Sequence, residues 1–347
     1  MRALTVRPGR PGGGSLVDEW PEPDPAEGDV LVRTLAVGVC GTDREILAGE
    51  HGQTPPGEDA LVLGHEVLGE VDYAPAASGL APGDRVVGIV RRPDPAPCLN
   101  CAAGEPDMCR TGEYTERGIK GLHGFAREQF RARAEELVRV PDGLGSRAVL
   151  VEPASVVAKA WEHIERIGSR AAWQPETLLV TGAGPIGLLA ALLGTQRGLD
   201  VHVLDRVVTG PKPDLVARLG ARYHTGEVSE LGLRPDVVIE CTGAAPVVAG
   251  VLRGNAPNAV VCLTGVSAAG RSTSVDIGAI NRERVLDNDV VFGSVNANRR
   301  HYEQAVEALA AADGGWLDGL LTRRVPLERF VDALDAGDDD VKSVLEL

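Results

Sequence analysis

The pattern of apolar and polar positions changes near residue 150, and this change predicts two domains. Before it, short apolar runs such as 29–37 and 84–90 alternate with Gly and Pro turns. That spacing is typical of short strands in an irregular, partly barrel-like β-rich domain. After it, apolar runs of strand length alternate with helical patterns, which predicts a parallel sheet covered by helices. A chain of 347 residues is also longer than one hydrophobic core usually fills.

Several shorter elements follow from the same pattern. We expect a helix over 43–48, the last strand of the parallel sheet over 290–296, and C-terminal helices over 300–311 and 327–336. A further helix is expected to start near Pro153, because proline is favoured in a first turn and apolar residues follow at helical spacing. The domain boundary is therefore expected near this proline.

The first strand of the second half, 177–181, runs directly into a glycine-rich turn. Gly182, Gly184 and Gly187 follow the GxGxxG pattern, and an apolar helix, a second strand and a terminal acid, Asp205, come next. This order within about 30 residues is a strong indication of dinucleotide binding. The first glycine allows a tight turn, the second lets the backbone approach a pyrophosphate, and the third lets helix and strand pack closely. A doubly wound domain that binds no dinucleotide is the alternative.

Asp205 also bears on the choice of cofactor. A carboxylate at the end of the second strand can accept hydrogen bonds from the ribose diol of NAD, and it would repel the 2′-phosphate of NADP. We therefore expect NAD to be favoured. The adjacent Arg206 keeps NADP possible, because a guanidinium can bind that phosphate.

Two glycine-flanked turns in the first half carry residues that bind metals. Cys40 lies in the stretch 38–43, and His65 lies in Gly64-His65-Glu66. A thiolate and an imidazole can bind one Zn²⁺ together, with a third ligand from later in the chain. The alternative is a buried thiol and a core histidine that bind nothing.

A third group of candidate ligands lies in residues 91–110, which we call the cysteine loop. Cys98, Cys101 and Cys109 sit there among Pro, Gly and Asn with almost no apolar periodicity. A loop without a core of its own is usually cross-linked, and a structural zinc would do this. A tetrahedral site needs a fourth ligand, for which Asp94 is the candidate and Asp107 the runner-up. Three free cysteines in an exposed loop are the alternative.

The composition restricts the partners and the compartment. A net charge of −15 argues against nucleic acid and anionic membranes as partners. No run approaches the roughly 18 apolar residues of a membrane-spanning helix, and no signal peptide is recognisable. We expect a soluble, cytoplasmic protein whose six cysteines are reduced metal ligands and core residues. Arginine carries most of the basic charge, since the only lysines are Lys120, Lys159, Lys212 and Lys342.

Together these motifs resemble the zinc-containing medium-chain dehydrogenases over nearly the whole chain. The resemblance rests on the two metal turns, the cysteine loop, the glycine turn and the stretch Glu-Cys-Thr-Gly at 240–243. It implies an α/β protein with a GroES-like catalytic domain, residues 1–153 and 296–347, and an inserted Rossmann domain, residues 154–295. Many alcohol dehydrogenases have a cysteine at the position of Glu152. A zinc site with a carboxylate there resembles that of the sugar and polyol branch. Two further stretches, 114–119 and 293–296, are similar to the glucose 1-dehydrogenases of archaea and some bacteria.

The resemblance implies a role for each matching position. Cys40, His65 and Glu152 match the ligands of a catalytic zinc. Thr42 matches a hydroxyl that relays a proton, and Glu66 matches an acid that touches the metal, its water or the substrate. The positions that match substrate contacts are Glu66, Glu116, Glu152 and Asn296, and those that match cofactor contacts are Gly182, Gly184, Pro185, Ile186, Gly187, Asp205, Arg206, Thr242 and Asn296. The family has a cysteine where Asp94 stands, which leaves the occupancy of the structural zinc open.

The reaction that this resemblance implies is oxidation of an aldose at its anomeric carbon. The C1 hydride would pass to the nicotinamide of NAD(P), giving an aldonolactone. The alternatives are dehydrogenation of another polyol, cyclitol or secondary-metabolite alcohol, reduction of a carbonyl or imine, and a non-catalytic dinucleotide-binding protein. The same resemblance implies a homodimer or homotetramer.

Overall fold

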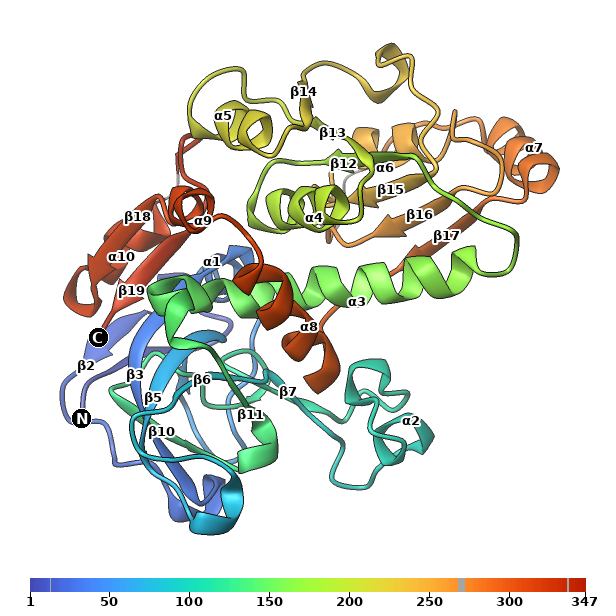
Figure 1. The fold of residues 1–347 in the computed structure, drawn as a ribbon. Coiled ribbons are helices and arrows are strands. Elements are labelled where there is room, and N and C mark those ends of the chain that lie inside the picture. Colours follow the sequence, from blue (N-terminus) through green and yellow to red (C-terminus); the bar gives the residue numbers. More distant parts are fainter. Residues whose placement is uncertain (13, 268–271, 336) are drawn as a thin grey trace. The chain divides into compact units, whose positions relative to one another are not determined.

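The computed structural model describes residues 1–12, 14–267, 272–335 and 337–347, and the chain divides into two compact units (Figure 1). The first unit contains Met1–Ser155 and Asn296–Leu347, and the second contains Val156–Val295. Both ends of the chain therefore belong to the first unit. No helix of the described residues is both long enough and apolar enough to cross a membrane.

The main sheet of the first unit is built around its longest strand, β3. Its order is β11-β6-β5-β3-β19-β18, and β10 also pairs with β3. Figure 1 shows the C-terminal strand β19 beside β3, with which it is antiparallel. The strands are β3 (Val30–Val39), β5 (Glu66–Tyr73), β6 (Arg85–Gly88), β10 (Gln129–Ala132), β11 (Leu137–Arg139), β18 (Arg323–Pro326) and β19 (Ser343–Glu346). The core contains many valines of this sheet, such as Val32, Val37 and Val67, together with the contacting rings of Phe125 and Phe130.

Two smaller sheets and several short helices complete the first unit. One sheet has the order β2-β1-β4 and the other β7-β8-β9. Their strands are β1 (Ala3–Val6), β2 (Ser15–Val17), β4 (Leu61–Val62), β7 (Arg91–Arg92), β8 (Thr115–Arg117) and β9 (Gly121–Leu122). The α-helices are α1 (Gly41–Leu47), α2 (Leu99–Ala102), α8 (Arg299–Ala310), α9 (Gly314–Leu320) and α10 (Phe330–Leu334). The 3₁₀ segments are η1 (Pro25–Glu27), η2 (Ala76–Ser78), η3 (Pro106–Met108), η4 (Ala134–Glu136), η5 (Asp142–Leu150) and η7 (Leu327–Arg329).

The second unit is a doubly wound parallel sheet. Its order is β14-β13-β12-β15-β16-β17, and every neighbouring pair is parallel. The strands are β12 (Thr177–Thr181), β13 (Asp200–Leu204), β14 (Arg222–His224), β15 (Val237–Glu240), β16 (Val260–Leu263) and β17 (Val290–Gly293). The connecting segments are α4 (Pro185–Gln196), α5 (Pro211–Arg218), η6 (Val228–Glu230), α6 (Ala245–Val251) and α7 (Ile277–Asp287). Counted from β12, this order is that of a Rossmann sheet, which confirms the predicted fold class.

Helix α3 (Val151–Gly168) begins in the first unit and continues into the second. It starts two residues before Pro153, so this proline lies in the first turn as its fixed φ angle favours. The first turn also carries Glu152.

Some element boundaries differ from those expected. Helix α1 begins at Gly41 because Cys40 caps it. The strand expected over 290–296 ends at Gly293, and Asn296 has a left-handed backbone with φ of 61°. Helix α9 and strand β18 had no distinct signal in the sequence pattern. The last residue of the helix expected over 327–336 lies outside the described residues.

Candidate active site

Cys40 lies where β3 passes into α1 and caps that helix. Its sulfur accepts a hydrogen bond from the backbone N–H of Thr42 at 3.3 Å, and its own N–H donates to Asp43 Oδ2 at 2.9 Å. This reciprocal capping satisfies backbone donors that the first helical turn leaves unpaired. The thiol is thereby fixed by the local chain, and Thr42 and Asp43 are fixed with it.

His65 stands directly against the Cys40 thiol. The distance from His65 Nε2 to Cys40 Sγ is 3.0 Å, and the other ring nitrogen, Nδ1, lies 3.5 Å from Asp43 Oδ1. Burial of the ring disfavours its charged form, but the electrostatic interactions with Cys40 and Asp43 raise the pKa of His65 well above its ordinary value. The ligand atoms of Cys40, His65 and Glu66 all lie within 4.8 Å of one another.

Glu66 is held by a residue that the sequence analysis did not single out, Lys342. Both carboxylate oxygens of Glu66 accept a hydrogen bond from Lys342 Nζ at 2.6 Å, and the same ammonium donates to Val39 O at 3.2 Å. Both side chains are almost fully buried, at 3% and 1% exposure. A Cβ atom on Gly38, which is paired with Glu66 across the two strands, would overlap Glu66 Oε2. The glycine therefore makes room for this ion pair.

One feature of the sequence, the rarity of lysine, weakly indicates that Lys342 is unusual. It is one of only four lysines in a chain that otherwise uses arginine. Arginine is larger and more rigid than lysine, so a lysine kept in such a chain can mark a confined position. Nothing in the sequence pattern indicates that its partner is Glu66.

Glu152 is near this group but not part of its closest cluster. In the described residues, the group of ligand atoms that lie within 4.8 Å of one another, which we call the 4.8 Å cluster, contains Glu66 and not Glu152. Desolvation raises the pKa of Glu152 to about 7, with further contributions from the charges of Glu66 and Asp43, while His65 and Lys342 oppose the rise. No described residue donates a hydrogen bond to the Glu152 carboxyl group, whereas Glu66 has Lys342.

The chemistry of these side chains fits a zinc ion. A thiol, an imidazole and carboxylates are the usual zinc ligands. Asp43 Oδ1 and His65 Nδ1 are buried and face each other without a hydrogen bond of normal geometry. Two ligands on a tetrahedral zinc stand roughly 3.6 Å apart at usual bond lengths, so the 3.0 Å contact of Cys40 and His65 needs only a small opening.

Glu116 and Asn296 are brought together although they lie 180 residues apart. Asn296 Nδ2 donates to Glu116 Oε1 at 2.8 Å. Glu116 lies on β8, opposite Arg91 on β7, and Arg91 donates to the same oxygen from Nε at 3.1 Å and from Nη2 at 2.9 Å. Two residues proposed to contact substrate thus form one hydrogen-bonded group, and Arg91 is an addition that the sequence analysis missed.

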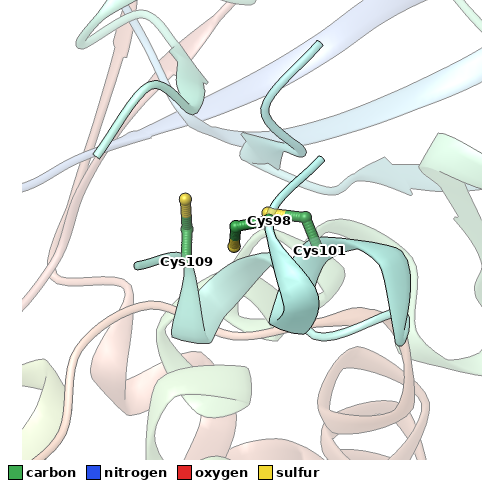
Figure 2. Close-up of side chains that lie close together, drawn as sticks. All are labelled: Cys98, Cys101 and Cys109. Atoms are coloured by element: carbon green, nitrogen blue, oxygen red, sulfur yellow. The ribbon is translucent and has the colours of Figure 1, made fainter. Parts of the chain in front are cut away.

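The three thiols of the cysteine loop also converge. Figure 2 shows Cys98 and Cys101 at helix α2 and Cys109 beside them, and their sulfurs lie within 4.8 Å of one another. The backbone N–H of Arg110 donates to Cys98 Sγ and helps to lower the pKa of Cys98 to about 6. Burial raises the pKa of Cys101 to about 11. A group of three sulfurs suits a soft or borderline metal ion such as zinc.

Neither candidate for a fourth ligand is in this cluster in the described structure. The carboxylate of Asp94 accepts hydrogen bonds from Ala96 N at 2.8 Å and from Thr111 Oγ1 at 2.6 Å. Asp107 Oδ1 accepts from Asn298 Nδ2 at 3.0 Å. The Thr111 hydroxyl in turn lies 3.2 Å from Cys109 Sγ. The hydroxyl of Thr111 therefore connects the Asp94 carboxylate to the thiol of Cys109.

Substitution of Asp94 by asparagine is therefore expected to leave zinc in the cysteine loop. An amide retains an acceptor oxygen for the Ala96 N–H, and the three thiols are unchanged. Zinc per chain, measured by mass spectrometry after dialysis, should equal that of the wild type. Cys98→Ser is the matched control and should lose the loop zinc. If Asp94→Asn loses as much zinc as this control, Asp94 is a ligand.

The glycine-rich turn of the second unit lies between β12 and α4. Gly182 has φ of 92°, Gly184 caps α4, and Pro185 and Ile186 begin that helix. A Cβ atom on Gly187 would overlap the carbonyl oxygen of Gly182, so only glycine allows this closeness of helix and turn.

The predicted ribose acceptor, Asp205, is tied to the same turn. Its Oδ2 accepts from Ala183 N at 2.6 Å, and its Oδ1 accepts from Val207 N at 2.9 Å. Arg206 is exposed beside it. Thr242 donates through its backbone N–H to Glu240 Oε1 at 2.7 Å, after the end of β15. The turn, Asp205 and Thr242 thus lie at the carboxyl ends of neighbouring strands, where α/β sheets bind ligands.

Two family models together match most of the chain. Residues 26–142 match the alcohol dehydrogenase GroES-like domain, and residues 145–347 match the glucose dehydrogenase C-terminus. The glucose 1-dehydrogenase of Methanocella arvoryzae is 38% identical over 361 residues, covering 100% of this chain and 99% of the relative. That of Thermoproteus tenax is 42% identical over 353 residues, with the same coverage.

The solved structures agree with these matches. The structure of Haloferax mediterranei glucose dehydrogenase in complex with NADP, Zn and gluconolactone has a TM-score of 0.92 and 36% identity, covering 100% of this chain and 99% of that one. Galactitol-1-phosphate dehydrogenase of Escherichia coli shares the fold, with a TM-score of 0.82 over 100% of both chains and 20% identity.

Proposed function

This chain belongs to the zinc-containing medium-chain dehydrogenase/reductase family, in its glucose 1-dehydrogenase branch, and we propose that it oxidises an aldose at C1 with NAD(P) as hydride acceptor. The observation that carries this proposal is the cluster of Cys40, His65 and Glu66 at the end of β3, in a chain that matches glucose 1-dehydrogenases from end to end. The product would be an aldonolactone, and the Haloferax relative's complex contains a compound of this class.

We assign the zinc ligands as Cys40, His65 and Glu152. Glu66 already has a buried counter-charge in Lys342, whereas no described residue donates a hydrogen bond to the Glu152 carboxyl group. A carboxylate that is desolvated without a partner favours a cation beside it. When bound, zinc supplies the positive charge that makes the C1 hydroxyl of the sugar easier to deprotonate.

The chain's own residues then carry the proton and orient the sugar. Thr42, fixed beside the Cys40 sulfur, takes the C1 hydroxyl proton and passes it outward, while the C1 hydride leaves for the nicotinamide. Glu66, Glu116 and Asn296 bind the remaining hydroxyls. Glu116 Oε2 accepts no hydrogen bond from the described side chains. Leaving this oxygen unpaired in the complex is costly, so alcohols without a matching hydroxyl should be poor substrates.

For the cofactor, we propose that NAD is preferred and NADP accepted. Asp205 stands at the end of β13 beside the glycine turn, where a carboxylate favours a free ribose diol. Arg206 offers a positive charge next to it. The structure of the Haloferax relative is a complex with NADP. NADP is therefore the hydride acceptor to compare with NAD.

The proposal is tested with purified, zinc-loaded protein, glucose and a panel of aldoses, polyols and cyclitols. We expect an increase in absorbance at the wavelength of NAD(P)H with glucose and its epimers, and lactone as the product by NMR. Activity restricted to a non-aldose alcohol would refute the aldose assignment. Binding of dinucleotide without any turnover would instead support a non-catalytic protein. The ratio of kcat/KM with NAD and with NADP decides the cofactor preference.

We further propose that the chain forms a homo-oligomer through the β17 edge of its parallel sheet. Helix α7, which precedes this edge strand, exposes Ile277, Val285 and Leu286 at 70%, 67% and 64%. In the described residues β17 is the last strand of its sheet, and an edge strand together with exposed apolar side chains favours a second copy. Sedimentation at micromolar concentration should give a multiple of the 36.4 kDa chain mass, and a monomer would contradict the proposal.

A reducing, cytoplasmic setting is part of the proposal as well, since all six cysteines are unpaired.

A further inference from the structure

We propose that Arg91 is a positioning residue for substrate binding, which fixes Glu116 and anchors it to the turn at residues 105–107. Arg91 is 6% exposed, and its side chain lies between Glu116 and the turn that carries Cys109. The inference rests on the proposed role of Glu116 as a sugar contact. It adds a residue whose effect on substrate binding passes through that carboxylate.

All the hydrogen bonds that Glu116 receives from described side chains end on one oxygen. Oε1 accepts from Arg91 Nε, Arg91 Nη2 and Asn296 Nδ2, at 3.1, 2.9 and 2.8 Å. Oε2 accepts none from the described side chains, and the side chain is 11% exposed. One oxygen is thus held by three donors, while the other keeps its lone pairs for a hydroxyl group of a substrate. A freely rotating carboxylate would have to be ordered when the sugar binds, at an entropic cost.

Arg91 is itself fixed on the side away from Glu116. Its Nη1 donates to the backbone oxygen of Asp107 at 3.2 Å, and its guanidinium stacks over the Tyr114 ring at 3.7 Å from the centroid. Asp107 lies in η3, two residues before Cys109. The planar guanidinium can make these contacts at once because its donors point in different directions. The position of Glu116 therefore depends on the position of the turn that contains Asp107.

The second donor to Glu116 is anchored on the same turn. Asn298, two residues after Asn296, donates from Nδ2 to Asp107 Oδ1 and to Glu105 Oε2, both at 3.0 Å. Arg300 also binds Glu105, through Nη1 at 2.6 Å. The segment with Asn296 and the strand with Arg91 thus meet on residues 105–107. This arrangement gives residues 105–107, next to Cys109, a role beyond local folding, because they set the geometry of two proposed sugar contacts.

The test compares Arg91→Gln with Arg92→Gln. Arg92 is the neighbouring residue of β7, is similarly buried at 8% exposure, and binds a different acid, Glu136, at 2.9 Å. We expect Arg91→Gln to raise KM for the aldose by about tenfold to a hundredfold, the range for lost hydrogen bonds to a charged group. Its kcat and its KM for NAD(P) should stay within about threefold of wild type, as for lost ground-state binding. Arg92→Gln should lower the thermal midpoint without this rise in KM.

Conservative replacement and structure determination separate positioning from folding. Arg91→Lys should restore part of the affinity, because an ammonium can reach Oε1 but cannot also hold the Asp107 carbonyl. A crystal structure of Arg91→Gln should show Glu116 displaced and the remaining sheet unchanged. An unchanged Glu116, an unchanged KM, or an equal rise in KM for Arg92→Gln would overturn the proposal. If the wild type oxidises only another alcohol, the proposed function fails. The positioning role of Arg91 is then still tested by the KM for that alcohol and by the position of Glu116 in the Arg91→Gln structure.

Discussion

Glu152→Ala is expected to lose the active-site zinc and to lower kcat/KM by about a thousandfold or more, because a zinc ion supplies several kcal/mol of transition-state stabilisation. The substituted residue lies in the first turn of α3. The parallel sheet of the second unit does not contain it, so the dinucleotide fold should be retained. Zinc per chain, steady-state kinetics and a fluorescence titration with NAD(P)H measure these three outcomes separately.

A matched control for this substitution lies on the same helix. Glu165 is exposed there and pairs with Arg197 at 2.8 Å. Glu165→Ala should retain zinc and activity, because an exposed ion pair contributes little. Retained zinc with near-normal turnover in Glu152→Ala would remove Glu152 from the ligand set. Glu66, the carboxylate inside the 4.8 Å cluster, would then take its place as third ligand.

Lys342→Met is expected to destabilise the first unit by about 3–5 kcal/mol, the usual cost of removing one partner from a buried ion pair. The substitution leaves the carboxylate of Glu66 buried at 2% exposure without the ammonium that contacts both of its oxygens. Activity should fall as well, since Glu66 stands beside Cys40 and His65. Chemical denaturation followed by fluorescence gives the stability, and the NAD(P)H assay gives the activity.

Two further variants distinguish the ion pair from a general effect of losing a lysine. Lys212 in α5 is partly exposed and has no ion pair in the described structure, so Lys212→Met should be close to wild type in stability. The double variant Lys342→Met/Glu66→Gln removes both charges and should recover part of the lost stability. If the single variant is as stable as wild type, the ion pair contributes nothing to the fold. If the double variant regains stability but not activity, the Glu66–Lys342 pair has a role in the reaction.

The relation between local sequence and structure explains which parts of the site were predictable. The glycine turn, its strand and its helix are adjacent in the chain, and the overlap that a Cβ atom on Gly187 would make with the Gly182 carbonyl is a property of six residues. The Cys40 cap is equally local, since the thiol, Thr42 and Asp43 span four residues. The cysteine loop brings together sulfurs from positions 98, 101 and 109. In each case short-range geometry decides the arrangement, and a single sequence contains it.

Contacts between distant segments were not predictable in the same way. Cys40 and His65 meet because β3 pairs with β5 in a register that sets Gly38 opposite Glu66. A shift of that register by one residue would turn Glu66 to the other face of the sheet. Residue types suggested that these side chains share a site, but strand pairing is what gives the 3.0 Å contact.

The sequence by itself determined the fold class, the dinucleotide turn and the residues that can bind zinc, because those features depend on neighbouring positions and on side-chain chemistry. Only the tertiary structure decided which residues contact the carboxylates of Glu66 and Glu116. Lys342 is 276 residues from Glu66 in the chain, and Asn296 is 180 residues from Glu116. No periodicity connects positions so far apart, and a buried charge is paired by whichever strand the fold places beside it. The resemblance already implied Glu152 as third zinc ligand, and the folded chain adds the contact of Lys342 with Glu66, which supplies that acid with a counter-charge of its own.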